Sequence, residues 1–432
     1  MTLTEGLVRL IRAKPVDSND LAKAALFVLD TVANALAARG TEPGTILRRW
    51  AKEQGRGQGR DAGRDAFLMG GLVHILETDD LHRASVVHPG CVVVPAAFAV
   101  AGRDGAAGRA VLEAVLHGYE ACCRVGMAVG PAHYRIWHNT ATCGPFGSAM
   151  ATAALLGLDD PQAVHALGNA GTQAAGLWQF LDTGAMSKHM HAGRAAEAGV
   201  VAADLAKLGF TGPPAILEGD KGFFAGACPD ADPLAVLGNA EAAWQVHDTS
   251  IKPWPSCRHT HPVIDAALEL HGDIGGEDVA EIQVQTYSAA LDVCDRSRPE
   301  SEYEAKFSLQ HCAGIALTDG EVGFSSFDSG ARKRVAALAA RTSVAVGEPF
   351  ATDYPGAWGA RLAVITAGGR RLEAGRTHCK GDPELALSSA EMMVKARHLL
   401  SYAGLDDGAA EALVDAILAL ADDGQLPDLD LL

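Results

Sequence analysis

The sequence predicts a mainly α-helical protein in which a smaller α+β domain is inserted before the last helices. Its 432 residues are many for a single core, which favours two domains. With 48% hydrophobic residues, 21% charged residues and 48 glycines, the composition is that of a globular protein whose helices approach closely. β-branched, alternating segments are concentrated after residue 244, and the helical pattern returns after residue 385. We therefore expect a helical domain over 1–243, an α+β domain over 244–384, and a segment, 385–432, that rejoins the helical domain.

Apolar segments of the first domain are rich in alanine and glycine. Residues 19–39 carry apolar side chains at helical spacing, which predicts an amphipathic helix. Residues 66–76 and 92–102 are largely apolar and should be buried, and 195–208 is expected to form a small-residue helix closed by a glycine. The polar, glycine-rich stretch 51–65 matches no phosphate-binding loop, so we interpret it as a solvated linker.

The second domain is predicted from its alternating segments. Strands are expected at 245–251, 279–287, 342–347, 360–367 and 370–377. Gly368-Gly369 lies between the last two and indicates a hairpin. Helices at 262–271 and 303–318 should cover one face of the sheet.

The charge balance restricts the partners. With 36 basic and 53 acidic residues the net charge is −17, so neither nucleic acid nor an anionic membrane is an expected partner. A small anionic ligand would need cations gathered in one pocket. The first residues lack a secretory signal pattern, and we expect a cytoplasmic protein. The nine cysteines are scattered without a Cys-x-x-Cys pair, which predicts neither disulfides nor a metal cluster.

One stretch concentrates groups for acid–base chemistry. Residues 77–90, ETDDLHRASVVHPG, place three carboxylates and two histidines between apolar segments. Its candidate proton donors and acceptors are Asp79, Asp80, His82 and His88. The closing Pro-Gly stops a helix, so we expect a loop between helices. The alternative interpretation is a solvated interhelical loop with a capping aspartate.

Three later stretches pair basic or imidazole groups with small-residue helices. They are 138–158 (HNTATCGPFGSAMATAALLGL), 187–213 (SKHMHAGRAAEAGVVAADLAKLGFTGP) and 252–268 (KPWPSCRHTHPVIDAAL). Together with 77–90, each resembles a motif of the MmgE/PrpD family, in the family's order. That family includes 2-methylcitrate dehydratases, cis-aconitate decarboxylases and iminodisuccinate epimerases. The resemblance extends to past residue 320, and it implies the same two-domain fold and a homodimer.

The resemblance also implies which residues are catalytic. His138 matches the family's histidine before the Gly-Pro-x-Gly turn, and Lys188 matches the lysine before the His-x-Gly segment. His88 matches the family's His-Pro motif, and Asp79 and Asp80 match its paired aspartates. A carboxylate beside an imidazole raises its pKa and fixes its tautomer, so orienting a histidine is the expected task of one aspartate.

Neighbours of these residues receive weaker assignments. Lys188 could fix a substrate carboxylate or, with its pKa lowered by burial, transfer a proton. Glu77 stands where relatives commonly carry aspartate, and His191 is expected to orient its neighbours. His74 lies in an apolar run and is interpreted as a core histidine without a chemical role.

Substrate contacts are predicted at six residues: Lys252, Arg258, His259, His261, His311 and His82. The lysine and the arginine suit recognition of carboxylates. Metal binding by the His-x-His pair of 252–268 with His189 and His191 is a weaker alternative, because the spacing places no acidic third ligand. We therefore predict no metal and no cofactor.

Two positions depart from the cis-aconitate decarboxylase branch, which carries histidine at the place of Cys257 and tyrosine near the place of His311. Both departures weaken the decarboxylase hypothesis. We predict a metal-independent hydro-lyase, similar to 2-methylcitrate dehydratase, that removes a proton beside a carboxylate of a small hydroxylated di- or tricarboxylate. An epimerase of a dicarboxylate needs the same carbanion and stays open as the alternative, ahead of a decarboxylase and a non-catalytic carboxylate binder.

Overall fold

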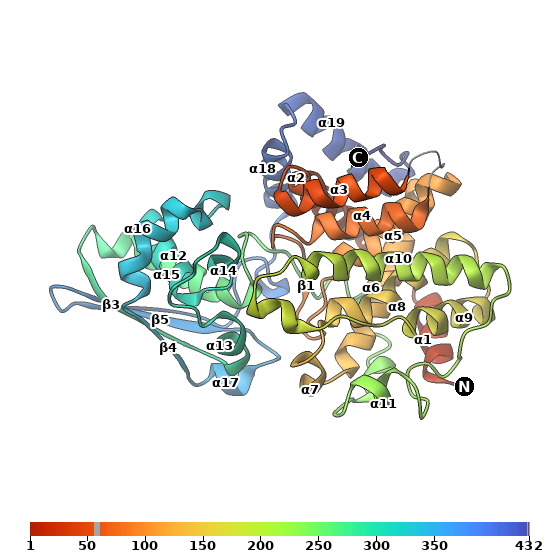
Figure 1. Cartoon of the computed structure of the whole chain (residues 1–432), viewed down its shortest axis with the longest axis horizontal. Helices are drawn as coiled ribbons and strands as arrows, with labels where there is room; N and C mark the ends of the chain where they lie inside the picture. The colour runs from red at the N-terminus through yellow and green to blue at the C-terminus, as the bar shows by residue number, and fades with distance from the viewer. Residues whose placement is uncertain (56–60, 430, 432) are drawn as a thin grey trace. The chain divides into compact units, whose positions relative to one another are not determined.

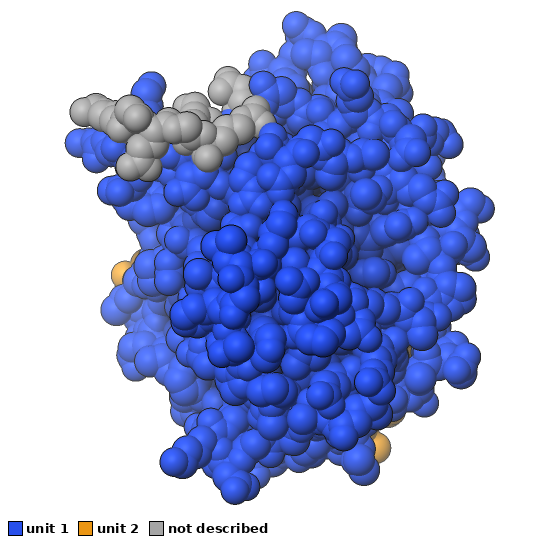
Figure 2. Space-filling model, turned by 90° about the vertical axis from the view of Figure 1, so that its right-hand side faces the viewer, with its two compact units in different colours: residues 1–249, 388–432 blue, residues 250–387 orange. Residues whose placement is uncertain are grey.

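The structure is a computed structural model that describes residues 1–55, 61–429 and 431 (Figure 1). It is mainly α-helical, which confirms the predicted fold class. The chain divides into two compact units, one of residues 1–249 and 388–432 and the other of residues 250–387 (Figure 2, blue and orange). The boundaries expected from the sequence were 243/244 and 384/385. We call these parts unit 1 and unit 2.

Unit 1 is built from helices that pack around one another (Figure 1). Their bounds are α1 (Leu3–Ala13), α2 (Ser18–Ala38), α3 (Glu42–Gln54), α4 (Ala62–Val73), α5 (Gly90–Asp104), α6 (Gly108–Ala128), α7 (Pro131–Tyr134), α8 (Asn139–Leu155), α9 (Asp160–Gly171), α10 (Ser187–Lys207), α11 (Phe223–Ala227), α18 (Ser389–Tyr402) and α19 (Asp407–Leu418). Capping boxes at Thr2 and Asp17 fix the starts of α1 and α2. Helix α10 packs against α4, α8 and α9, and α8 packs against α5 and α6. The C-terminal α18 packs against α2, so the end of the chain rejoins the first helices (Figure 1).

Small residues let these helices approach closely. At Gly199 of α10, a Cβ atom would lie 2.1 Å from the Ser148 Oγ of α8. At Gly147 of α8, a Cβ atom would lie 2.8 Å from the carbonyl oxygen of Gly118 in α6. Ser148 Oγ also donates to the Ala195 carbonyl of α10, 2.6 Å away. Glycine and alanine in these helices are therefore a packing requirement.

Helix α2 is the predicted amphipathic helix of 19–39. Among the described residues it is the one helix long and apolar enough to span a membrane by composition, with a mean hydropathy of 1.5 over an 18-residue window. However, 83% of that window is buried inside the protein, against α4 and α18 among others. A buried core helix passes the same test, so the composition of α2 is explained by its packing.

Unit 2 contains a four-stranded sheet with strand order β4-β3-β5-β6. Strands β3 (Val279–Thr286), β4 (Thr342–Val346), β5 (Ala360–Thr366) and β6 (Arg371–Arg376) lie where strands were predicted. Strands β5 and β6 form the predicted hairpin, and β3 pairs parallel to β4 and antiparallel to β5. Helix α12 (His261–Ile274) packs against β5 and β6.

Remaining helices of unit 2 are α13 (Ser288–Cys294), α14 (Glu302–Lys306), α15 (Leu309–Asp319), α16 (Ser329–Ala339) and α17 (Phe350–Asp353). The helix expected at 303–318 is therefore broken into α14 and α15. The break occurs at Ser308, whose side chain caps α15 by accepting the amide of His311 at 2.9 Å.

Two further predictions differ from the structure. The strand expected at 245–251 is wrong except for Thr249–Ser250 (β2), because the Gln245 amide donates to Glu120 Oε2 and the segment turns. In the expected linker 51–65, helix α3 continues to Gln54 and α4 begins at Ala62. Residues 56–60 of that stretch lie outside the described residues.

Gly199→Ala tests the close approach of α10 and α8. We expect it to lower the free energy of unfolding by about 1–3 kcal/mol, because the added methyl must displace α8. Gly226→Ala, in α11 of the same unit, is the matched control, since nothing lies within 4 Å of an added Cβ there. It should change the free energy of unfolding by less than about 1 kcal/mol. Denaturant unfolding measures the free energy of unfolding of both variants. Equal values for Gly199→Ala and Gly226→Ala would contradict the close approach of α10 and α8.

Candidate active site

The segment between α4 and α5 is a buried loop. Helix α4 ends at Val73 and α5 begins at Gly90, which confirms the predicted loop between helices. Glu77, Asp79 and Asp80 are only 1%, 1% and 2% exposed. The alternative of a solvated loop is therefore wrong. Because burial of a carboxylate is costly, each of the three needs a partner.

Asp79 joins two histidines. Its Oδ2 atom lies 2.6 Å from His74 Nδ1 and 3.2 Å from His88 Nδ1. The two imidazole rings meet edge to face, with centroids 4.7 Å apart. A carboxylate accepts hydrogen bonds, so Asp79 favours the His74 tautomer that carries a proton on Nδ1. For His88 the same carboxylate is an ion-pair partner when the ring is protonated.

His138 stands beside this pair at the start of α8. Its ring stacks on that of His74 with centroids 5.5 Å apart, and its Nδ1 atom lies 3.3 Å from His191 Nδ1. Burial lowers the pKa of His138 well below its usual value, and the positive charges that His74, His191 and Lys188 can carry lower it further. His138 is therefore neutral at pH 7 and can accept a proton.

Lys188 brings a cation to the same cluster. It is the second residue of α10, where the helix dipole disfavours positive charge. Its ammonium group donates to the Glu77 carboxylate, and the two side chains are 4% and 1% exposed. Glu77 itself has a φ of 61°, in the left-handed region that is uncommon for residues other than glycine. A buried ion pair and a strained backbone thus meet at one residue of the loop.

Asp80 connects the loop to two helices. Its Oδ1 atom accepts the Gly90 amide of α5 at 3.0 Å, and its Oδ2 atom accepts the Tyr119 hydroxyl of α6 at 2.7 Å. Burial raises the pKa of Asp80 to about 8, and the nearby charges of Asp79 and Asp30 act in the same direction. Asp80 has no hydrogen bond or ion pair with a histidine in the described residues, and its two bonds are those of a residue that positions the loop.

His82 has partners outside the group of His74, His88 and His138. Its Nδ1 atom lies 2.8 Å from Ser85 Oγ, and its side chain also bonds Gln245. Burial and the charge of Arg83 lower the pKa of His82 to about 4. The predicted role of His82 as a substrate contact stays a prediction.

In unit 2, Arg258 and His259 have fixed partners. Arg258 forms a buried ion pair with Asp382. His259 Nδ1 lies 2.7 Å from the Tyr287 hydroxyl, and its ring stacks on that of Trp358 with centroids 4.4 Å apart. Both side chains are held rigidly within unit 2, and their role in substrate binding stays a prediction.

The other predicted contacts of unit 2 are also buried. Lys252 is 1% exposed. His261 Nε2 lies 3.3 Å from the Ser256 carbonyl oxygen, and His311 Nε2 lies 2.8 Å from the Ser326 carbonyl oxygen. His311 thus uses one ring nitrogen to hold the segment after α15.

The sequence interpretation missed His74. It was expected to be a core histidine, and it is indeed 0% exposed. It nevertheless bonds Asp79, stacks on His138 and meets His88 edge to face. The available signal was its position five residues before Asp79, at the end of the apolar segment that leads into the carboxylates.

Among the residues that the structure describes, two groups of side chains have donor atoms close enough to surround a metal ion. They are His74, Asp79 and Cys91 in unit 1, and His378, Asp382 and Glu384 in unit 2. The first set fits a metal poorly: burial raises the pKa of the Cys91 thiol well above its usual value, and the thiol donates to the His88 carbonyl oxygen at 3.2 Å. In the second set the Asp382 carboxylate already forms an ion pair with Arg258, so it is a poor metal ligand.

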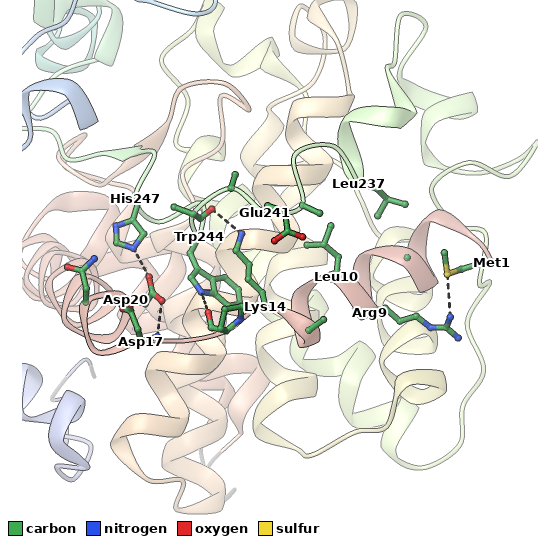
Figure 3. A pocket seen from close by; sticks show the side chains of 17 residues that line it. Met1, Arg9, Leu10, Lys14, Asp17, Asp20, Leu237, Glu241, Trp244 and His247 are labelled. Atoms are coloured by element: carbon green, nitrogen blue, oxygen red, sulfur yellow. Dashed lines mark hydrogen bonds and ion pairs between the residues drawn. The ribbon is translucent and has the colours of Figure 1, made fainter.

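A separate cavity of about 1040 Å³ lies at α1 and residues 237–247 (Figure 3). Three of its ionic side chains have ion-pair partners: His247 Nε2 lies 2.7 Å from Asp20 Oδ1, and Lys14 Nζ lies 2.9 Å from Glu120 Oε1. None of the predicted site residues lines it. The candidate site is therefore the cluster of His74, Asp79, His88, His138 and Lys188, which we call the histidine cluster.

Comparison with known proteins gives two family matches. Residues 7–234 match the MmgE/PrpD N-terminal domain, and residues 254–420 match the MmgE/PrpD C-terminal domain. A cis-aconitate decarboxylase of Aspergillus terreus is 28% identical over 316 residues, which cover 67% of this chain and 64% of that protein. The cis-aconitate decarboxylase-like protein oryM of Aspergillus oryzae is 26% identical over 84% of this chain and 80% of its own length. A cis-aconitate decarboxylase of Homo sapiens is 28% identical over 61% of this chain and 56% of its own length.

Asp80→Asn tests the raised pKa. The folded protein retains a proton on Asp80 up to about pH 8, whereas the unfolded chain releases it near the ordinary pKa of 3.8. The stability that this proton contributes is complete below about pH 4 and is lost as the pH rises through about 8. Asparagine is neutral throughout, so the melting temperature of the variant relative to the wild type should rise between about pH 5 and pH 8. Thermal unfolding measures this; a difference independent of pH would contradict the shift.

Proposed function

Because the chain belongs to the MmgE/PrpD family, we propose that it is a lyase of the 2-methylcitrate dehydratase type, which removes water from a small hydroxylated di- or tricarboxylate. The observation that carries this proposal is the contact of one buried carboxylate, Asp79, with two imidazoles beside a neutral third one, His138. Dehydration needs a proton acceptor, a proton donor and a cation, and this cluster offers all three.

His138 is the proposed base. A neutral imidazole accepts the proton from the carbon beside the substrate carboxylate, and the electron pair of that bond forms the new double bond. His88 is the proposed acid, because Asp79 supplies the negative charge that accompanies a protonated ring. His88 gives its proton to the departing hydroxide, so the products are the alkene and water.

Lys188 is the proposed electrostatic group. Proton removal beside a carboxylate places negative charge on the carboxylate oxygens, and a cation in a dry site stabilises that charge more than water does. Lys188 is 3% exposed and is close enough to lower the pKa of His138. Glu77 holds its ammonium group in place.

Decarboxylation of a cis-aconitate-like substrate is the second candidate. It is favoured by the names of the relatives in Aspergillus and Homo sapiens. It breaks the bond to a carboxylate, releases carbon dioxide and adds one proton to the remaining carbon, so it needs an acid such as His88 and no base. Cys257 and His311, where the sequence departs from that branch, weaken this candidate.

A single incubation distinguishes these reactions and the epimerase. Purified enzyme receives 2-methylcitrate, citrate or cis-aconitate in deuterated water, and products are followed by ultraviolet absorbance, NMR and released carbon dioxide. Alkene formation from the hydroxylated acids supports the dehydratase. Carbon dioxide from cis-aconitate identifies the decarboxylase. Deuterium incorporation without loss of water or carbon dioxide identifies an epimerase, and no change with any substrate contradicts all three.

His138→Ala tests the proposed base. Loss of a positioned proton acceptor should lower kcat by about 10²–10⁴-fold. His165→Ala is the matched control, because His165 also lies in unit 1 but bonds the Gly212 carbonyl oxygen away from the cluster. It should keep the wild-type kcat. Steady-state kinetics compares the two; a His138→Ala enzyme with normal kcat would refute the assignment.

Removal of metals tests the predicted independence of cofactors. Prolonged dialysis against a chelator should leave kcat unchanged, because the groups that transfer protons and hold charge are all side chains in this proposal. The check is turnover before and after dialysis, with metal content measured on both samples. Lost activity that returns with added zinc or iron would assign a metal to the site.

A further inference from the structure

The C-terminal helix α18 reaches the buried loop through one lysine. Lys395 Nζ lies 2.6 Å from the Thr78 carbonyl oxygen and 2.5 Å from Asp30 Oδ1 of α2. The Lys395 side chain is 10% exposed and that of Asp30 is 2% exposed. The ammonium group of this long side chain is thus held by two buried partners. One of them, Thr78, lies more than 300 residues before Lys395 in the sequence.

Thr78 occupies the central position of the site loop. It stands between Glu77, which holds Lys188, and Asp79, which holds His74 and His88. Rotation of the Thr78 peptide would move both carboxylates. Its hydroxyl also donates to Asn34 Oδ1 of α2, so its side chain and its carbonyl are both anchored.

The loop conformation needs such anchors because it is strained. A non-glycine residue with a φ of 61°, such as Glu77, costs about 1–3 kcal/mol and persists only where the surroundings impose it. Glu77 could leave that conformation if the adjacent Thr78 carbonyl were free to turn. The bond from Lys395 opposes this rotation.

Lys395 also compensates a buried charge. Asp30 lies in α2 close enough to Asp80 to act on it electrostatically. Without a cation, Asp30 would be a buried negative charge in α2 beside a loop that already carries Glu77 and Asp79. The Lys395 ammonium group therefore both neutralises Asp30 and holds the Thr78 carbonyl oxygen.

We propose that Lys395 is a positioning residue of the active site, which holds the Thr78 peptide so that Glu77 and Asp79 stay aligned with Lys188 and the histidines. Lys395 acts through the loop and does not touch the reacting atoms. The C-terminal helices are thereby a functional part of the site. The kinetic measurements that test this proposal rest on the proposed function, whereas the hydrogen–deuterium exchange measurement does not.

The first experiment compares variants within α18. Lys395→Met should lower kcat by about 10–100-fold with a smaller change in KM, because displaced catalytic groups slow the chemical step. Lys395→Arg keeps a cation and several donors, and should restore kcat to within about tenfold of the wild type. Arg397→Met is the matched control: Arg397 lies on α18 like Lys395 but forms an exposed ion pair with Glu411 of α19, and its loss should leave kcat unchanged.

A double variant separates positioning from charge compensation. Lys395→Met alone leaves Asp30 buried without its cation, which can destabilise the fold. In Asp30→Asn/Lys395→Met both charges are absent, so thermal stability should recover while the bond to Thr78 stays broken. Low kcat in a stable double variant supports the proposal. Wild-type kcat in that variant overturns it, because Lys395 would then only neutralise Asp30.

Hydrogen–deuterium exchange of residues 74–90 supplies the readout that needs no substrate. The double variant should exchange faster in this segment than the wild type and Arg397→Met do, and unchanged exchange overturns the proposal. If the wild type turns over none of the substrates, the proposed function fails and the exchange result still decides the role of Lys395.

Discussion

Unit 1 depends on the burial of a loop that carries three carboxylates. A buried carboxylate without a partner costs several kcal/mol, so each of Glu77, Asp79 and Asp80 must be satisfied from within the protein. Their partners come from different helices: Lys188 from α10, the Tyr119 hydroxyl from α6, and the histidines from the loop itself. The loop cannot adopt this state until those helices are in place, and the helices would enclose uncompensated polar groups without it.

Such a cluster adds little net stability. Desolvation of a buried ion pair roughly cancels the attraction between its charges, so apolar side chains would fill the same space at lower cost. The benefit lies in fixed geometry and in pKa values shifted from those in water. His138 stays neutral because it is buried among groups that can carry positive charge, and Asp80 retains its proton to about pH 8. Neighbouring groups whose pKa values are shifted in opposite directions, as in His138 and Asp80, are typical of active sites.

The same cluster is compatible with more than one reaction of the family. Dehydration, epimerisation and decarboxylation each transfer a proton at a carbon near a carboxylate, so an acid such as His88 and a cation such as Lys188 serve them all. Differences between branches are expected where the substrate's side groups are recognised. The sequence predicts such differences at Cys257 and His311, and His311 Nε2 lies 2.8 Å from the Ser326 carbonyl oxygen. The choice of reaction is therefore a question of recognition more than of the proton carriers.

The sequence by itself determined the mainly helical class, the inserted α+β domain, the β5–β6 hairpin and the loop before α5. These follow from local patterns: helical and alternating periodicity, a Gly-Gly turn and a Pro-Gly stop. It also singled out Asp79, His88, His138 and Lys188, through motifs that lie far apart in the chain.

Only the tertiary structure decided how those residues are used. His74 was expected to be a core residue, but in the structure its ring contacts Asp79, His88 and His138. Such contacts depend on how the ends of helices pack together, which local sequence does not specify. The tertiary structure made the expected strand at 245–251 a turn, because a carboxylate of α6 competes for its amide. It brought Lys395 to Thr78 across the length of the chain. Local periodicity encodes which residues are helical, whereas contacts between distant residues arise only once the helices have packed.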